Sequence, residues 1–250
     1  MELIQTDDKG LGSFIAPKDD MIGECIKNTG AWEGHLYFLY SKLIKKSDVI
    51  LDAGANIGFH SIQFGKLGSK VYCYEPQPSI FNILAANIAI NDLSEKVYPY
   101  RLGLSDKASK IKFTPLSKCL DNCGLMNYGG RGLTNDEEGE GEIEVVPFNY
   151  DVDVIKMDIQ GGELYALKGM ESILDKCNPW IMIENYTWAE NDKLVLKFLY
   201  DKGYTIYRLM VGNNEYCFAF KDNVPDHSLI KNLFHDNKHQ LPYEEYKNLE

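Results

Sequence analysis

The stretch "DVILDAGANIGFHSI", residues 48–62, joins an apolar run to a glycine turn and then to a helical pattern. The apolar run predicts a buried strand, and Gly54 permits a tight turn directly after it. Gly58 opens the following helix, whose first backbone N–H groups lack partners inside the helix and can face a ligand. This corner therefore predicts one strand of a parallel sheet with a binding site at its carboxyl end.

Apolar runs alternate with helical patterns through the rest of the chain. The predicted strands are residues 48–55, 69–76, 96–104, 152–158, 179–186, 204–212 and 215–221. The predicted helices between them are residues 57–68, 78–92, 162–176 and 190–203. Such alternation indicates right-handed βαβ units, and hence an α/β fold with a mainly parallel sheet and helices on both faces. Two turn residues separate the last two strands, which predicts a hairpin and an antiparallel edge.

Two further segments complete what we interpret as one domain spanning residues 1–250. Residues 1–48 form an N-terminal cap segment, with a short strand and a helix that begins near Trp32. Residues 116–142 show no periodicity and are rich in glycine, asparagine and acids. Because irregular segments of this length are usually functional or disordered, we expect a substrate loop here, with Arg131 as its main cation and as a group that can hold an acidic substrate.

The C-terminal tail, residues 223–250, carries three of the five histidines. His235 and His239 have the spacing of a metal-binding pair on a helix, although a solvated tail helix is the simpler interpretation.

Composition limits the class of protein. The 250 residues carry a net charge of −11, which argues against a nucleic-acid partner because such binding relies on Lys and Arg. We see no apolar run long enough for a membrane span and no leader-like start. The six cysteines are scattered, as in a reducing compartment, so we expect a cytoplasmic protein. Apolar strands at the hairpin edge are compatible with a homodimer.

Two carboxylates are expected beside the first glycine turn. Glu75 ends the second strand, 23 residues after Asp52, where an acid can accept hydrogen bonds from ribose hydroxyls. The turn lacks the second glycine of a dinucleotide fingerprint, and two carboxylates would repel a pyrophosphate. S-adenosylmethionine fits better, because it carries a ribose and a positive sulfonium but no phosphate. The alternative is a strand–turn–helix corner with Asn56 as helix cap.

The quoted stretch, "VYCYEPQPSIFNILAANIAIND" (residues 71–92) and "VIKMDIQGGELYALKGMESIL" (residues 154–174) together resemble the FkbM-type methyltransferases. That family belongs to the class I S-adenosylmethionine-dependent enzymes, so the resemblance implies a Rossmann-like seven-stranded sheet with a late antiparallel strand. It also implies methyl transfer, usually to a hydroxyl of a sugar, glycan or natural product. The cofactor residues that it implies are Asp52, Gly54, Ala55, Asn56, Gly58, Glu75, Pro76, Ser105, Asp106 and Glu33.

The resemblance has two departures. The segment before the fourth strand, "VVPFNYDVDVIKMD" (residues 145–158), is shorter than the family's, which usually carries an acidic pair. The family motif reads K-x-D-x-E-G-x-E, and this chain has Gln160 where the first Glu is expected. The acceptor and any need for a divalent metal are therefore open. An N-methyltransferase, an enzyme acting on a small non-sugar metabolite, and a catalytically silent cofactor-binding fold remain alternatives.

Lys156, Asp158 and Gln160 alternate along the end of the fourth strand and should share one side of it, facing the cofactor crevice. We expect Asp158 to take the proton of the acceptor hydroxyl and Lys156 to keep Asp158 ionised. A divalent ion bound by Asp158 and Glu163 is a second version of this site. Alternatively, Glu163 stabilises the start of its helix and Lys156 pairs with Asp158 structurally.

His60, on the first helix, is a further candidate for the catalytic base. A histidine packed near the start of its helix is an equally simple interpretation.

Overall fold

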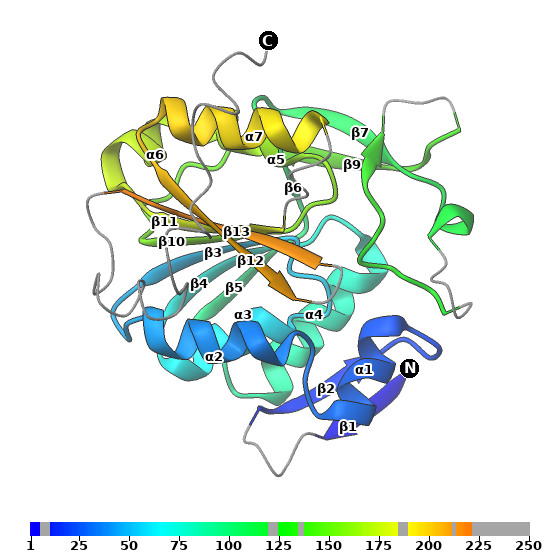
Figure 1. The fold of residues 1–250 in the computed structure, drawn as a ribbon. Helices are drawn as coiled ribbons and strands as arrows, with labels where there is room; N and C mark the ends of the chain where they lie inside the picture. Colours follow the sequence, from blue (N-terminus) through cyan, green and yellow to red (C-terminus); the bar gives the residue numbers. More distant parts are fainter. Residues whose placement is uncertain (6–10, 120–124, 135–137, 185–189, 212–213, 222–250) are drawn as a thin grey trace.

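A seven-stranded sheet runs through the middle of the molecule (Figure 1). The computed structural model describes residues 1–5, 11–119, 125–134, 138–184, 190–211 and 214–221. The strands, in their order across the sheet, are β12 (Thr205–Val211), β13 (Asn214–Phe220), β11 (Trp180–Glu184), β10 (Val154–Met157), β3 (Val49–Ala53), β4 (Lys70–Tyr74) and β5 (Val97–Tyr100). Only β13 runs antiparallel to its neighbours. The mostly parallel sheet predicted from the sequence is confirmed, although β13 lies inside the sheet and β12 forms the edge.

The chain winds from β3 toward β5 in one direction and from β10 toward β12 in the other. The strand order therefore reverses between β3 and β10, which pair in parallel with Asp52 opposite Lys156. Ligands of open parallel sheets bind at the carboxyl ends of the strands that flank such a reversal. The topology thus places the first glycine turn beside the end of β10.

Helices cover both faces of the sheet (Figure 1). One face carries α2 (Gly34–Leu43), α3 (Phe59–Leu67) and α4 (Pro78–Ile90), and the other carries α5 (Glu163–Gly169), α6 (Glu171–Cys177) and α7 (Glu190–Asp201). Alternate strand residues serve the two layers: Ile50 packs into the core under α2–α4, and Leu51 packs into the core under α5–α7. β3 is apolar except for Asp52, and such nearly continuous apolar runs are the pattern expected of a sheet buried on both faces.

The predicted helix over residues 162–176 is two helices. The break falls at Met170, after α5. A Cβ atom added at Gly169 would lie 2.0 Å from the carbonyl oxygen of Ser105, so the end of α5 packs directly on backbone. Hydrophobic periodicity continues across the break, which explains why the sequence pattern does not reveal it.

Residues 103–146 form a second, four-stranded sheet that the sequence analysis missed. Its order is β6 (Gly103–Leu104), β9 (Glu140–Val146), β7 (Ser109–Phe113) and β8 (Leu133–Thr134). Ile143 and Val145 are buried between exposed glutamates, which is the alternation of a half-buried strand. The expected irregular segment over residues 116–142 is therefore partly strand at its C-terminal end.

The N-terminal segment packs on α4. It comprises β1 (Glu2–Gln5), β2 (Ser13–Ala16) and α1 (Met21–Thr29), of which only β2 was predicted. Asn87 of α4 both accepts from the backbone N–H of Ile15, at 2.6 Å, and donates to its carbonyl, at 2.9 Å. The side chain of Asn87 thus makes the pair of backbone hydrogen bonds to β2 that a neighbouring strand would otherwise make. The tail histidines lie outside the described residues.

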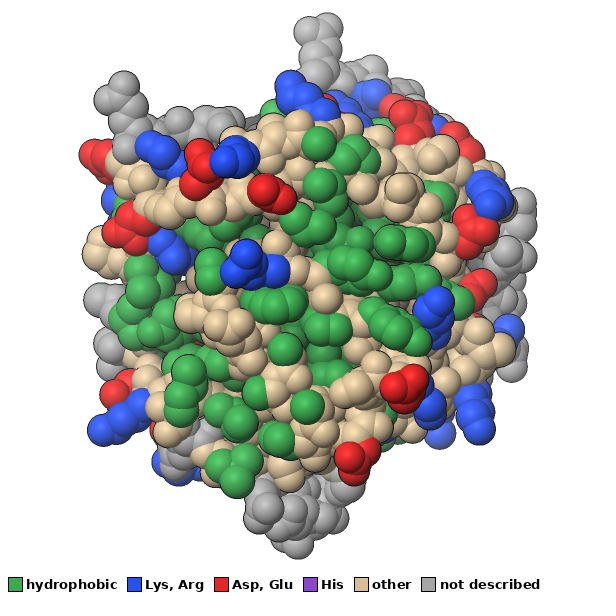
Figure 2. All heavy atoms as spheres, turned by 180° about the vertical axis from the view of Figure 1, so that it is seen from behind, with side chains coloured by type: hydrophobic (Ala, Val, Ile, Leu, Met, Phe, Trp, Pro, Cys, Tyr) green, Lys and Arg blue, Asp and Glu red, His purple; other side chains and the backbone are tan. Residues whose placement is uncertain are grey.

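Hydrophobic side chains spread over the face opposite to the view of Figure 1 (Figure 2). Near the β5 edge, tyrosines stack on one another in pairs. The rings of Tyr72 and Tyr150 lie 4.5 Å apart, and those of Tyr74 and Tyr100 lie 4.9 Å apart.

No described helix is both long and apolar enough to cross a membrane. The predicted homodimer stays a prediction.

Candidate active site

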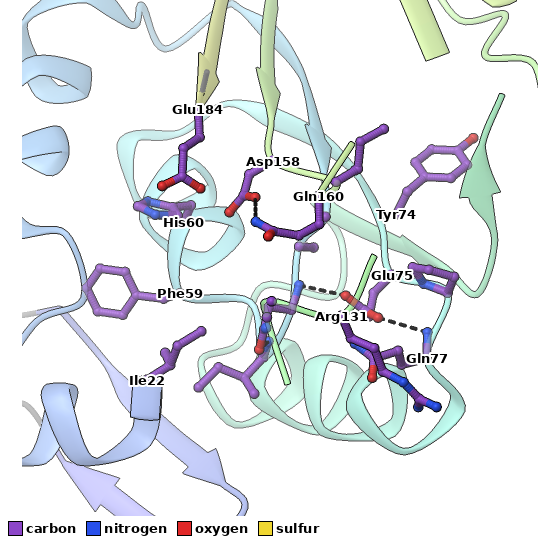
Figure 3. Close-up of a pocket in the computed structure, with 18 of the residues that line it drawn as sticks. Ile22, Phe59, His60, Tyr74, Glu75, Gln77, Arg131, Asp158, Gln160 and Glu184 are labelled. Atoms are coloured by element: carbon purple, nitrogen blue, oxygen red, sulfur yellow. Dashed lines mark hydrogen bonds between the residues drawn. The ribbon is translucent and has the colours of Figure 1, made fainter. Parts of the chain in front are cut away.

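A cavity of about 380 Å³ lies at the carboxyl ends of β3, β4, β10 and β11 (Figure 3). Residues from the first glycine turn, the ends of these strands, α1, α3 and the segment 127–131 line it. The predicted site residues among them are Glu33, Gly54, Ala55, Asn56, His60, Glu75, Pro76, Lys156, Asp158 and Gln160. Asp52, Gly58, Ser105, Asp106 and Glu163 are not part of the lining.

The glycine turn after β3 depends on left-handed backbone. Gly54, Asn56 and Gly58 have φ angles of 79°, 51° and 92°. A Cβ atom at Gly54 would lie 1.9 Å from the carbonyl oxygen of Asp158, so only glycine fits there. The backbone N–H groups of Gly54 and Ala55 both donate to the carbonyl of Tyr74 at 3.0 Å. These contacts hold the turn between the ends of β4 and β10.

Glu75 stands at one end of the cavity. Its carboxylate accepts from the backbone N–H groups of Asn56, at 3.0 Å, and Gln77, at 2.8 Å. Burial raises the pKa of Glu75 to about 7, although these two backbone donors act in the opposite direction. Leu102, Gly103 and Leu104 also line the cavity, whereas the predicted cofactor residues Ser105 and Asp106 directly after them do not.

Asp52 is fully buried behind the cavity. It accepts from Ser61 Oγ at 2.5 Å, and its Oδ1 lies 3.4 Å from Lys156 Nζ. Lys156 also donates to the carbonyl of Gly54 at 3.1 Å. Burial acts to lower the pKa of Lys156, but the nearby carboxylates of Asp52, Asp158 and Glu33 outweigh this effect. The pKa of Lys156 is therefore raised. Asp52 thus affects the cavity indirectly: it pairs with Lys156, and Lys156 in turn holds the glycine turn through the carbonyl of Gly54.

Asp158 follows β10 and faces the cavity (Figure 3). Gln160 Nε2 donates to its Oδ1 at 2.6 Å. Burial raises the pKa of Asp158, and the opposing effects of Lys156 and Gln160 are smaller. Lys156 thus acts in the expected direction, toward the ionised carboxylate, but burial outweighs it. A raised pKa makes the Asp158 carboxylate a stronger proton acceptor.

Glu163 turns away from the cavity. Its two carboxylate oxygens accept from the backbone N–H groups of Ile159, at 3.0 Å, and Gly161, at 2.9 Å. This is the helix-start role that the sequence left open. Glu163 is absent from the lining that contains Asp158, and no group of three or more acids, histidines or cysteines that could hold a metal exists among the described residues. A divalent ion between Asp158 and Glu163 stays a prediction.

Glu33 precedes α2 with a left-handed φ of 47°. Its carboxylate lies 2.8 Å from His60 Nε2 and accepts from Tyr216 Oη. Burial alone would raise the pKa of Glu33, but His60, Tyr216 and Lys156 together lower it to about 2. His60 Nδ1 is buried and has no hydrogen-bond partner among the described residues. His60 therefore holds Glu33 in place. Its Nε2 is engaged by Glu33 and its Nδ1 is buried, so it presents neither ring nitrogen to a bound methyl acceptor.

Two parts of the lining were missed or only partly foreseen. Glu184 ends β11 and faces the cavity near His60 and Asp158 (Figure 3). An acid directly after an apolar strand was the signal that singled out Glu75, and it would have found Glu184 too. The segment 127–131 lies over the cofactor turn, where Gln77 Nε2 donates to the carbonyl of Tyr128 at 2.8 Å. The segment 116–142, which we expected to be the substrate loop, thus also covers the end of the cavity that contains Glu75.

The model of the FkbM methyltransferase domain matches residues 52–206. Methyltransferase sdnD of Sordaria araneosa is 27% identical over an alignment of 197 residues, which covers 64% of this chain and 74% of that protein. The hexuronic acid methyltransferase AglP of Haloferax volcanii is 30% identical over 142 residues, which are 56% of this chain and 56% of that protein.

Solved structures share the fold. The FkbM methyltransferase of Methylobacillus flagellatus KT has a TM-score of 0.52 and 20% identity, over 76% of this chain and 50% of that one. Precorrin-6y C5,15-methyltransferase of Geobacter metallireducens GS-15 has a TM-score of 0.51 and 16% identity, over 87% and 96%. The chain spans about half the length of AglP and of the FkbM structure. Since the domain model covers more than half of the sequence, the chain belongs to the FkbM methyltransferase family.

Proposed function

We propose that this S-adenosylmethionine-dependent methyltransferase transfers the methyl group to a hydroxyl oxygen of a sugar, glycan or glycosylated metabolite. The observation that carries the proposal is Asp158, a half-buried carboxyl with a raised pKa at the cavity wall beside the glycine turn. A hydroxyl is a poor nucleophile, so its methylation benefits from a base that takes its proton. Asp158 is the base, and the proton ends on its carboxylate.

The cavity fits the cofactor at its Glu75 end. Glu75 keeps lone pairs for two ribose hydroxyls, and the glycine turn supplies backbone close to the ligand. Leu104 and Phe113 offer apolar contact for an adenine. Bound there, S-adenosylmethionine would supply the methyl group. Carboxylates around the cavity favour its cationic sulfonium and disfavour a pyrophosphate.

The other end of the cavity suits a polyol. Asp158, Gln160 and Glu184 offer oxygen acceptors for hydroxyl groups, and Trp32 and Phe59 offer aromatic surface. Holding the acceptor oxygen in line contributes up to about 7–11 kcal/mol to such displacements, so positioning is the main task of these residues. A relative whose name describes a hexuronic acid methyltransferase supports a sugar acceptor.

Two measurements test the proposal. Isothermal titration should show binding of S-adenosylmethionine with one site per chain. Mass spectrometry after incubation with a panel of sugars and nucleotide sugars should then show a mass gain of one methyl group on oxygen. Cofactor binding combined with methylation of amines alone, or with no transfer to any sugar, would contradict the sugar hydroxyl as acceptor.

A further inference from the structure

The acceptor end of the cavity is rich in carboxylates. Asp158 and Glu184 come from the ends of neighbouring strands and lie close together in the cavity (Figure 3). Glu33 lines the same end, and a pKa lowered to about 2 keeps its carboxylate ionised at neutral pH. A ligand group placed here meets negative charge from three different elements.

The basic side chains of the lining are already engaged. Among its described residues these are Lys156, Arg131 and His60. Lys156 pairs with Asp52 at 3.4 Å, and His60 pairs with Glu33 at 2.8 Å. Arg131 donates to the carboxylate of Glu140 at 2.8 Å and to the carbonyl of Thr114 at 2.7 Å.

The guanidinium of Arg131 also lies 4.7 Å from the ring centre of Phe113, on the second sheet. Arg131 is therefore held at the β7–β9 side of the cavity. Each of the three cations thus already has a carboxylate partner within this chain.

Resting on the proposed function, we infer that the acceptor is uncharged around its reacting hydroxyl and that Glu184 helps to exclude sugar acids. Carboxylates in a partly buried site accept hydrogen bonds from neutral hydroxyls and repel a second carboxylate at the same position. A carboxylate oxygen that was itself the methyl acceptor would need no base, because it is already ionised. The arrangement therefore suits a neutral hexose or polyol better than a hexuronate, even though one relative is named for a hexuronic acid.

The test uses matched acceptors that differ only at C6: methyl glycosides of glucose, galactose and mannose, the corresponding uronic acids, and the neutral uronamides. We expect kcat/KM for the neutral sugar to exceed that for the uronate at least tenfold. The uronamide should recover most of this loss, since it matches the uronate in size but carries no charge. A uronamide as poor as the uronate would show that shape and not charge is selected, and would overturn the inference.

Glu184→Gln tests the residue itself. In this variant, the ratio of kcat/KM for the neutral sugar to kcat/KM for the uronate should fall at least threefold, chiefly because kcat/KM for the uronate rises. Glu142→Gln, an exposed acid of β9, should keep the wild-type ratio. Melting temperature and cofactor affinity verify that the variants fold. An unchanged ratio in folded Glu184→Gln, or a wild-type preference for uronates, overturns the inference alone. Failure to methylate any sugar despite cofactor binding overturns the proposed function, and this inference with it.

Discussion

Lys156 and Asp52 face each other on neighbouring parallel strands, with Nζ 3.4 Å from Oδ1. Both side chains are buried, and Lys156 also reaches the carbonyl of Gly54 in the cofactor turn. The ion pair thus ties the two central strands together at the point where the strand order reverses. Its position explains why a cation lies in a strand that is otherwise apolar.

Removing one partner of this pair should destabilise the protein strongly. Lys156→Met leaves Asp52 buried without its counter-charge, a change that typically costs about 3–5 kcal/mol. Urea unfolding should show this loss, and the double variant Asp52→Asn/Lys156→Met should recover part of it. Lys110→Met breaks an exposed pair with Glu142 and should cost less than about 1 kcal/mol. Equal losses in the two lysine variants would contradict a structural role for the buried pair.

Asp158→Asn should separate chemistry from cofactor binding. The amide cannot accept the hydroxyl proton, so kcat should fall by about 10²–10⁴. The affinity for S-adenosylmethionine, measured by titration calorimetry, should change by less than about threefold, because the proposed ribose contacts come from Glu75. Asp151→Asn, at an exposed ion pair with Lys176, serves as the control. Undiminished turnover in Asp158→Asn would rule out its role as base.

Cofactor affinity should depend on pH through Glu75. Its pKa is raised to about 7, so the carboxylate that accepts ribose hydroxyls is fully formed only above that pH. The dissociation constant should therefore fall as pH rises from 6 to 8. Glu75→Gln should bind more weakly, by about 1.5–3 kcal/mol, and should lose this part of the pH dependence. A pH dependence that persists unchanged in the variant would assign it to another group.

The stability of the ligand-free protein should fall between about pH 4.5 and 7. Burial raises the pKa values of Glu75 and Glu163 from 4.5 to about 7, so the folded state holds protons that the unfolded state has released. Each group then lowers the free energy of unfolding by about 3 kcal/mol as pH rises through this window. Urea unfolding at pH 5 and 8 measures the slope. Glu163→Gln should flatten it and exposed Glu142→Gln should not; the reverse result would refute the assignment.

Gly54 and Gly161 form a matched pair for a steric prediction. Both have positive φ, at 79° and 100°, so alanine at either position incurs a similar backbone cost of about 1–2 kcal/mol. Only at Gly54 does the added Cβ meet the Asp158 carbonyl; at Gly161 nothing lies within 4 Å. Gly54→Ala should therefore cost about 1–3 kcal/mol more in chemical unfolding, and it should weaken cofactor binding. Similar losses at both positions would mean that the turn can relax away from β10.

Local patterns were enough to predict the main sheet. Alternating apolar runs and helical patterns define its strands and helices, and "DAGANIG" with Glu75 and "KMD" indicates the cavity and its chemistry. These features are readable because the hydrophobic period and the turn residues depend on neighbours within a few positions.

Tertiary contacts determined the rest. The break between α5 and α6 comes from packing on Ser105, and the second sheet unites short strands that lie far apart in the sequence. The sequence indicated that Asp52, Glu33 and His60 matter. Only the folded chain shows that Asp52 forms an ion pair with Lys156 and that His60 contacts the carboxylate of Glu33. It also shows that Glu184 lines the same cavity as Asp158. Ionisation and pairing depend on burial and on charges from distant segments, and no local pattern encodes these.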